Sequence, residues 1–531
     1  MFVFPKSSKL LSSFLVLGLF ILTLIVPEQL SSQAKIKQIE IIQADRLLGK
    51  REGQEFEKLI GDVVLKHDSV FLYCDSAYRF KDINEVIAYG HVKLNQGDTL
   101  FLYADTLYYE GNTSKSRARQ NVLLIDPSTR LNTDFLDADF NTNISYFFNG
   151  GTIRDSANTL ISQEGFYYGD THDLNFISAV DLQTPDYLCK SDTLFYNTDN
   201  GIARFFGPTE IFNDTSYLYG KIGYYHTQLD VIQLGKDCYI EKEEWIIEAD
   251  SIFVNEQAGF GKAMQNVLME DTLQQILVAA HYVFFDENKS YSLATDSAVF
   301  MQYQDRDTLY LHADSLLFRE SESGSKLMQA YQNVRFFRYD MQGTCDSLAY
   351  LTNDSIIEMY REPILWNAES QLTAEFMKIH IKNQKANKID LIEKAFIVTK
   401  QDSLHYDQIS GKNMLGHIKN NVLYRIDVDG NAQTIYFPYD EQDIMGMNSA
   451  ESSNLIIWID QGQVIKISFI NSPEGLMLPR KDIKVKDSFL KGFQWWDFLR
   501  PHSKKEIFWR TSELLLNETK ESEEIKPTIE P

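Results

Sequence analysis

Residues 98–109 read D-T-L-F-L-Y-A-D-T-L-Y-Y, and versions of this stretch return about every thirty residues through most of the chain. Leu100, Leu102 and Ala104 alternate with aromatic residues, which is the two-residue period of a strand with one buried face. After Ala104 the apolar pattern resumes three residues later, at Leu107, so its parity changes. A bulge or a bend at Asp105 would turn the strand over at this point. The bent strand is the unit of the fold.

One acidic or equivalent polar residue marks the corner of each copy. The positions are Asp45, Asp75, Asp105, Asp139, Glu164, Asp192, Lys221, Asp250, His281, Asp314, Asp346, Glu375 and Lys412. The clearest copies begin at Asp68, Asp98 and Asp307, whereas the copies around three other positions are degenerate. A single repetitive body can therefore account for much of the length.

A second apolar stretch follows each clear copy after roughly 15 residues and has its own kink signal. Gly or Asn recurs before or next to a Val, as in Gly90-His91-Val92, Gln120-Asn121-Val122, Gln265-Asn266-Val267 and Gln332-Asn333-Val334. Gly and Asn tolerate a positive φ, so we expect these strands to bend as well. Polar turns, such as 110–112 and 197–201, would join the two strands of a unit.

These patterns predict an all-β protein. The repeated region has no long segment with a 3.6-residue period, and β-branched and aromatic residues recur with turn residues between them. Strands about ten residues long, two per unit and about 4.8 Å apart, would form a stack on the order of 100 Å long. Bending puts the halves of each strand in two facing sheets. We expect an elongated antiparallel two-sheeted β-jellyroll or solenoid built from repeats of about thirty residues, each of two bent strands.

Composition narrows the function. A net charge of −24 argues against a nucleic-acid surface, which needs clustered Lys and Arg, and against adsorption to an anionic membrane. Repeated acids bind Ca²⁺ in some solenoids, but those acids are closely spaced. We interpret the acids here as corner residues that bond to nearby backbone, and we expect no metal and no cofactor.

The N-terminus has the form of a secretory signal, with 1–34 removed. Lys6 and Lys9 precede the largely apolar run 10–26, and Ser32-Gln33-Ala34 offers small residues for cleavage. The alternative is an uncleaved anchor, for which the run is short. Nothing later in the sequence is apolar enough for a transmembrane helix.

Four cysteines in an exported chain invite a disulfide interpretation. However, Cys74 and Cys345 occupy the small buried position that Ala104 and Ala313 hold in sister units. We therefore expect free thiols.

The alternation of A-D-x-L-x-Y with A-x-G/Q-N/H-V-x-L resembles the OstA-like family, which includes periplasmic lipopolysaccharide-transport bridge proteins and the related N-terminal domain of the outer-membrane lipopolysaccharide assembly protein. The resemblance covers roughly 41–436. It implies a curved jellyroll that holds acyl chains along its interior, in the periplasm, with or without association with the outer membrane. It also implies lipopolysaccharide or a related lipid as ligand, and other transport proteins at the ends of the stack. This chain is much longer than the simple bridge protein.

An apolar seam between the sheets is the candidate lipid-binding site. Its predicted lining is Leu100, Leu102, Ala104, Ile247, Ala249, Leu309, Leu311 and Ala313. Each buried methylene would contribute roughly 0.8 kcal/mol. The same residues would equally close on one another as a dry core, and a lipid with phosphates would be repelled by the acidic surface unless its head group stayed in solvent or divalent cations bridged it.

The expected function is therefore non-catalytic lipid binding in lipopolysaccharide transport and outer-membrane assembly. The main alternative is a structural or adhesive β-solenoid with a dry core. A polysaccharide-active enzyme is a weaker alternative, because no H-E-x-x-H, G-x-S-x-G or phosphate loop occurs and no carboxylate pair stands out.

The sequence changes character after the repeats. We assign 35–438 to the repetitive body, 439–510 to a C-terminal cap or docking segment, and 511–531 to a disordered acidic tail. Within the second of these, 455–459 and 464–469 suggest a hairpin, and aromatic residues cluster in 492–499.

Overall fold

Bent antiparallel strands make up nearly all of the chain. The structure is a computed structural model, and it describes residues 37–49, 55–97, 100–243, 245–304, 307–320, 324–351, 354–382, 385–419, 422–440, 443–460 and 463–524. The expected signal segment therefore lies outside the described residues, as do Asp98 and Thr99. No helix in the described ranges is long and apolar enough to cross a membrane.

The strands follow one another in three runs. The first is β1 (Glu40–Gln43), β2 (Arg46–Leu48), β3 (Glu57–His67), β4 (Val70–Phe80), β5 (Glu85–Gln96), β6 (Leu100–Glu110), β7 (Lys115–Ile125), β8 (Arg130–Asp139), β9 (Ile144–Phe147), β10 (Gly151–Arg154), β11 (Thr159–Ser162) and β12 (Glu164–Tyr168). The second is β13 (Asp173–Gln183), β14 (Leu188–Asn197), β15 (Ile202–Phe212), β16 (Ser216–His226), β17 (Val231–Lys242), β18 (Trp245–Asn255), β19 (Phe260–Asp271), β20 (Ile276–Asp286), β21 (Tyr291–Thr295), β22 (Val299–Gln304), β23 (Asp307–His312), β24 (Ser315–Glu320), β25 (Lys326–Arg338) and β26 (Met341–Leu351). The third is β27 (Ile356–Tyr360), β28 (Ile364–Asn367), β29 (Ser370–Thr373), β30 (Phe376–Lys382), β31 (Lys385–Lys400), β32 (Tyr406–Lys419), β33 (Val422–Tyr436), β34 (Tyr439–Asp440), β35 (Asp443–Ile444), β36 (Gly446–Asp460), β37 (Gln463–Ile470) and β38 (Glu474–Pro479).

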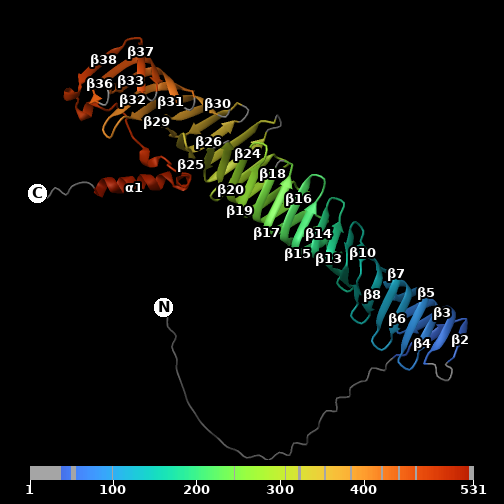
Figure 1. The fold of residues 1–531 in the computed structure, drawn as a ribbon. Helices are drawn as coiled ribbons and strands as arrows, with labels where there is room; N and C mark the ends of the chain where they lie inside the picture. Colours follow the sequence, from blue (N-terminus) through green and yellow to red (C-terminus); the bar gives the residue numbers. More distant parts are fainter. Residues whose placement is uncertain are drawn as a thin grey trace, which may run out of the picture.

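Long strands pair with their sequence neighbours, so the sheet grows in chain order along one elongated body (Figure 1). In several places a long strand is replaced by two short ones, such as β9 with β10 or β23 with β24, which pair with the two halves of a neighbour. The all-β antiparallel fold and its repeats of two bent strands are confirmed.

Each long strand bends where its register shifts. In β6 the shift lies between Tyr103 and Thr106, with Asp105 exposed at the corner. Leu102 and Ala104 are buried before the corner and Leu107 after it, so both halves turn their apolar faces to the same interior. The parity change in the sequence is this bend.

The facing strand bends through residues with positive φ. In β7 these are Gln120 and Asn121, with φ of 64° and 50°, and in β5 they are Gly90 and His91. The predicted second kink is confirmed. However, the recurring partner of the corner acid is a side chain on the facing strand rather than the nearby backbone that we expected. The pairs are His91 with Asp75, Asn121 with Asp105, Asn266 with Asp250, Asn333 with Asp314, Arg361 with Asp346 and Lys394 with Glu375.

The degenerate copies keep the corner with altered chemistry. At β16 the corner residue is Lys221, and its Nζ lies 2.5 Å from Oδ2 of Asp237, which stands at the positive-φ position of β17. The charges are exchanged while the geometry is retained.

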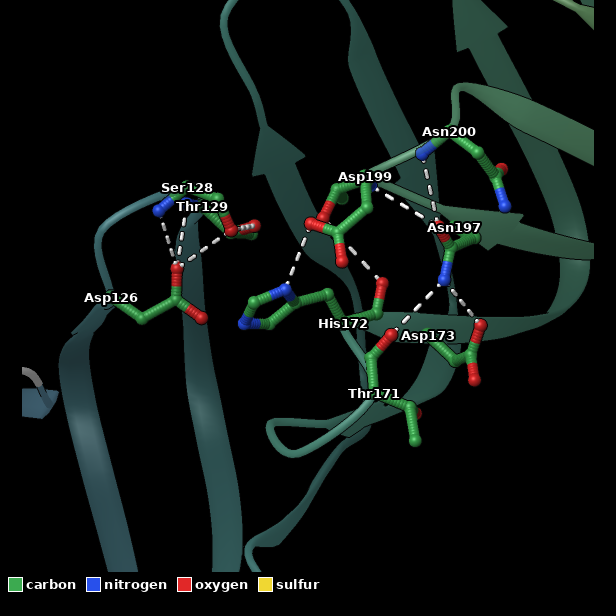
Figure 2. A network of polar contacts seen from close by, with 10 residues as sticks. Asp126, Ser128, Thr129, Thr171, His172, Asp173, Asn197, Asp199 and Asn200 are labelled. Atoms are coloured by element: carbon green, nitrogen blue, oxygen red, sulfur yellow. Dashed lines mark hydrogen bonds and ion pairs between the residues drawn. The ribbon is translucent and has the colours of Figure 1, made fainter.

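Polar turns join the strands along two rims. Turns that follow β3, β5, β7, β13, β15, β17 and β19 form the first rim; turns that follow β4, β6, β14, β16, β18, β20 and β24 form the second. On the first rim, Oδ1 of Asp126 accepts the backbone N–H groups of Ser128 and Thr129, both at 2.8 Å (Figure 2). On the second rim, Oδ1 of Asn197 accepts the N–H of Asp199 at 3.1 Å. Asx turns of this kind account for the Asn and Asp residues between strands.

The four cysteines are free and buried: Cys74, Cys189, Cys238 and Cys345. Cys74 packs in the same apolar core as Ala104, as its position in the repeat predicts.

The sheet continues beyond the expected boundary at 438. β36 pairs with β33 and has the same kind of register shift, so it is a further rung. β36 and β37 form the predicted hairpin, and β38 pairs with the other half of β36. The repetitive body therefore ends at Pro479.

Residues 480–510, here called the strap, then run back over the outer face of β23–β32. Four short 3₁₀ helices punctuate it: η1 (Arg480–Asp482), η2 (Val485–Asp487), η3 (Asp497–Leu499) and η4 (Glu506–Phe508). Buried side chains of the sheet bind its backbone: Gln408 contacts Ser488 and Leu490, Gln371 contacts Gln494 and Trp496, and Arg335 contacts Leu499 and Glu506. The aromatic residues of this segment do not cap the last rung; they cover earlier ones.

A helix follows where we expected a disordered tail. α1 spans Thr511–Glu524 and lies beside the middle strands of the body (Figure 1). Leu514 packs on the cluster of Ile364, Trp366 and Leu499, which anchors the first turn of α1. Residues 525–531 lie outside the described residues.

Candidate functional site

Opposite the corners, the two rims meet along a seam that tyrosines close. Oη of Tyr109, on the second rim, lies 2.7 Å from Nδ1 of His67 on the first. Further along, Oη of Tyr196 donates to Oδ2 of Asp155 at 2.6 Å and accepts from Nδ2 of Asn158 at 2.8 Å. Burial raises the pKa of Tyr109 to about 12, so this phenol stays protonated. These bonds hold the half-sheets together with neutral groups.

The closing tyrosines occupy one position of the repeat. Tyr109, Tyr167, Tyr196 and Tyr225 are each the next-to-last residue of their strand, and all four are buried. The interval between the last three is about 29 residues, and the next member of the series is Val254. At Val254 the ring is missing.

A cavity of about 410 Å³ opens at this point between the half-sheets. Most of its wall is apolar, with Leu218, Ile247, Val254, Met269, Ile276, Val278, Phe285, Phe300, Phe318 and Tyr350 among the lining residues. Phe285, Phe318 and Tyr350 are only partly buried. The volume falls in the range of about 300 to 1,000 Å³ that is usual for sites that bury small ligands.

Ion pairs replace the tyrosine bonds across the mouth of the cavity. Nζ of Lys242, on the first rim, lies 2.7 Å from Oε2 of Glu287 and 3.7 Å from Oε2 of Glu256, both on the second rim. Nζ of Lys326, on the second rim, lies 3.8 Å from Oδ2 of Asp271 on the first. Burial acts to lower the pKa of Lys242, but the hydrogen bond from Glu287 and the two negative charges outweigh it and raise that pKa. Lys242 is therefore firmly charged.

Carboxylates outnumber cations in the lining. The cations are Lys242, Arg319 and Lys326, and the carboxylates are Glu243, Glu256, Asp271, Asp286, Glu287 and Glu320. Phosphates would meet a net negative rim here. In the described ranges, no group of three or more His, Cys, Asp or Glu side chains is arranged to hold a metal ion.

A smaller cavity of about 60 Å³ continues the apolar lining toward β30. The two cavities share Phe300, Met328 and Tyr350 in their walls. The open part of the seam therefore extends from β16 to β30.

Comparison with known proteins bears on the N-terminal third. A family model described as OstA-like protein matches residues 36–192. This stretch is OstA-like. Among solved structures, the chain is similar to the crystal structure of LptH, described as the LptA-homologous periplasmic component of the conserved lipopolysaccharide transport device from Pseudomonas aeruginosa. The sequence identity is 10% and the TM-score 0.16, over 27% of this chain and 80% of that one. No curated protein matches the chain.

The OstA-like stretch and the cavity occupy different parts of the body. The predicted residues Leu100, Leu102 and Ala104 lie in the OstA-like stretch, where Leu102 and Ala104 are buried in the core and line neither cavity. There the seam is closed by tyrosine, and the dry-core alternative describes these side chains.

The other predicted residues lie nearer the open seam. Ile247 lines the larger cavity, and Leu309 and Leu311 line the smaller one. Ala249 and Ala313 are buried close to the corners and line neither cavity. The structure therefore brings three of the eight predicted residues to the opening.

Sequence reasoning missed the residues at the strand ends. Val254, Phe285 and Tyr350 belong to the tyrosine position of the repeat, which is visible in the sequence as a series of Tyr at equal intervals. A break in that series was the available signal. The ion pairs across the mouth have no such signal, since their partners come from turns with no fixed spacing.

Proposed function

We propose that this chain is a non-catalytic lipid-binding protein of lipopolysaccharide transport and outer-membrane assembly. It works in the periplasm and holds acyl chains of lipopolysaccharide or a related lipid between its half-sheets. The apolar cavity at Val254 carries the proposal, because an opening in an otherwise closed seam gives acyl chains a place to be buried. Each methylene that enters would contribute roughly 0.8 kcal/mol. The OstA-like stretch supports the same assignment.

The charge of the rim sets where the head group lies. Carboxylates such as Glu256 and Glu287 line the mouth, so a phosphorylated head group stays in solvent or is neutralised by divalent cations. Only the acyl chains occupy the cavity.

The ends of the body are the proposed contacts for other transport proteins. β1 and β2 pair with β3, and β37 and β38 pair with β36, so each end presents strand edges. Exposed apolar side chains accompany these edges, including Ile42 and Leu47 at one end and Ile465 and Leu476 at the other. Such edges can add a strand from a partner.

A photocrosslinking amino acid at Ile276 tests the proposal in cells. Ile276 is partly buried and lines the cavity, whereas Phe195 is 43% exposed on the outer face and serves as the matched control. Lipopolysaccharide adducts at Ile276 and none at Phe195 are expected. A folded Ile276 variant without lipid adducts would support the structural solenoid instead.

A further inference from the structure

We propose that acyl chains enter and leave the seam sideways through one port, the gap between the rims at Val254, and that the ion pair of Lys242 with Glu287 latches this port. The inference rests on the proposed function and adds where the lipid passes and what holds the passage shut.

The side-chain series locates the port. On its N-terminal side, Tyr225 is fully buried and its Oη lies 3.4 Å from Oγ1 of Thr184, so the ring and its bond cross the seam. The ring of Tyr187, from the first rim, packs against that of Tyr225 at 5.9 Å between centroids. One repeat later Val254 has neither a ring nor a hydroxyl group, and the cavity begins there. Passage toward the N-terminal half is blocked, so the ligand has to pass between the rims.

The latch differs from the tyrosine closures in its exposure to water. The side chains of Lys242 and Glu287 are 30% and 44% exposed, and Glu256 supplies a second carboxylate at 20%. Exposed ion pairs are weak and are screened by salt, whereas buried neutral bonds are not. Lys242 is also the cation that joins two successive turns of the second rim to the first rim. Releasing one side chain therefore frees the rims over the widest part of the seam.

The ligand class follows from this geometry. An amphiphile whose acyl chains are unbranched can slide between the rims while its head group stays among the carboxylates outside. A compact apolar molecule with no head group would fit the cavity equally well, so the kinetics of passage, rather than affinity alone, report on the latch.

Stopped-flow binding of 11-(dansylamino)undecanoic acid to the purified mature chain measures that passage. Lys242→Gln removes the latch charge. Lys221→Gln is the matched control, since it breaks a comparable Lys–Asp pair at an outer corner, with Asp237 at 2.5 Å. Val254→Tyr restores the missing ring and fills the port, and Val254→Phe is the smaller plug if the Tyr variant fails to fold. Circular dichroism confirms the fold of each variant.

At low salt we expect Lys242→Gln to associate and dissociate about fivefold faster than the unmodified chain, and Lys221→Gln to match the latter. Raising the salt to about 0.5 M should accelerate the unmodified chain and leave Lys242→Gln unchanged. Either plug should reduce binding about tenfold or more. If the unmodified chain binds the probe but the latch and plug variants behave like it, the port is wrong and the proposed function stands. If the unmodified chain does not bind and gives no lipid adducts in cells, the proposed function fails, and the port with it.

Discussion

Nδ2 of Asn121 lies 2.6 Å from Oδ2 of Asp105 and ties the positive-φ corner of β7 to the corner of β6. The same relationship recurs between Asn266 and Asp250 at 2.8 Å. At other rungs the pair is a His, Lys or Arg with an acid, or the charges are exchanged. The repeat therefore preserves corner geometry more strictly than residue identity.

Replacing Asn121 by Ala should lower the urea midpoint of unfolding measured by circular dichroism. The change removes the bond to Asp105 and places a Cβ residue without polar compensation at a φ of 50°, which costs about 1–2 kcal/mol. Asn121→Gly is the control, because glycine loses the bond but adopts the backbone freely. Equal losses in both variants would mean that backbone strain is not part of the effect.

Gly90→Ala should destabilise the chain more than Gly97→Ala. Both glycines have positive φ, 74° and 61°, so the backbone strain is similar. A Cβ on Gly90 would stand 2.3 Å from Oδ2 of Asp75, whereas nothing lies within 4 Å at Gly97. Thermal unfolding of the two variants isolates the clash, and Asp75→Ala in the Gly90→Ala background should recover part of the loss. No recovery would contradict this assignment.

Asp407 should make stability fall with rising pH. Burial raises its pKa to about 7, although the N–H of Phe437 and the amide of Gln401 both bond the carboxylate and oppose the shift. An unfolded Asp has a pKa of about 4, so between about pH 4 and 7 the folded state binds more protons, and this contribution to stability is lost as pH rises through that window.

Melting temperatures at several pH values check this expectation. Asp407→Asn should lose less stability than the unmodified chain between about pH 5 and 8, since the amide does not ionise. Asp443→Asn, at a side chain that is 87% exposed, is the matched control and should follow the unmodified chain. An unchanged pH profile in Asp407→Asn would refute the assignment.

Gln371→Ala should loosen the strap while leaving the sheet intact. Its Oε1 accepts the N–H of Trp496 at 2.7 Å and its Nε2 donates to the carbonyl of Gln494 at 2.9 Å, with the side chain fully enclosed. Loss of both bonds should speed hydrogen exchange in 490–500. Gln433→Ala, at an exposed side chain, provides the comparison. Protection of 490–500 equal to that of the unmodified chain would show that the apolar contacts hold the strap alone.

The corners could be predicted from the sequence because they leave local marks. The parity change after Ala104 and the Gly90-His91 pair each fix a bend within a few residues. Turn chemistry was equally local, as at Asn197. These features depend on neighbours in the chain, which is the range over which pattern reasoning works.

The strap and the port could not be predicted in the same way. A two-residue period shows which face of a strand is apolar but not what covers the other face. The runs Ile364-Leu365-Trp366 and Phe396-Ile397-Val398, apolar on both faces, carried a signal that these strands are covered twice. The port depends on bonds between turns dozens of residues apart, such as that between Lys242 and Glu287, and these leave no periodic mark.

The strap also imposes an order on how the molecule can be completed during synthesis. The N-terminal rungs need only their neighbours, so they can pack as soon as the chain supplies them. The outer faces around Arg335, Gln371 and Gln408 instead wait for residues 488–506, which the ribosome makes more than eighty residues later. Until then, a chain that has already built most of its length still carries an uncovered apolar flank with buried-type polar groups exposed, which is the stage at which a chaperone would recognise it.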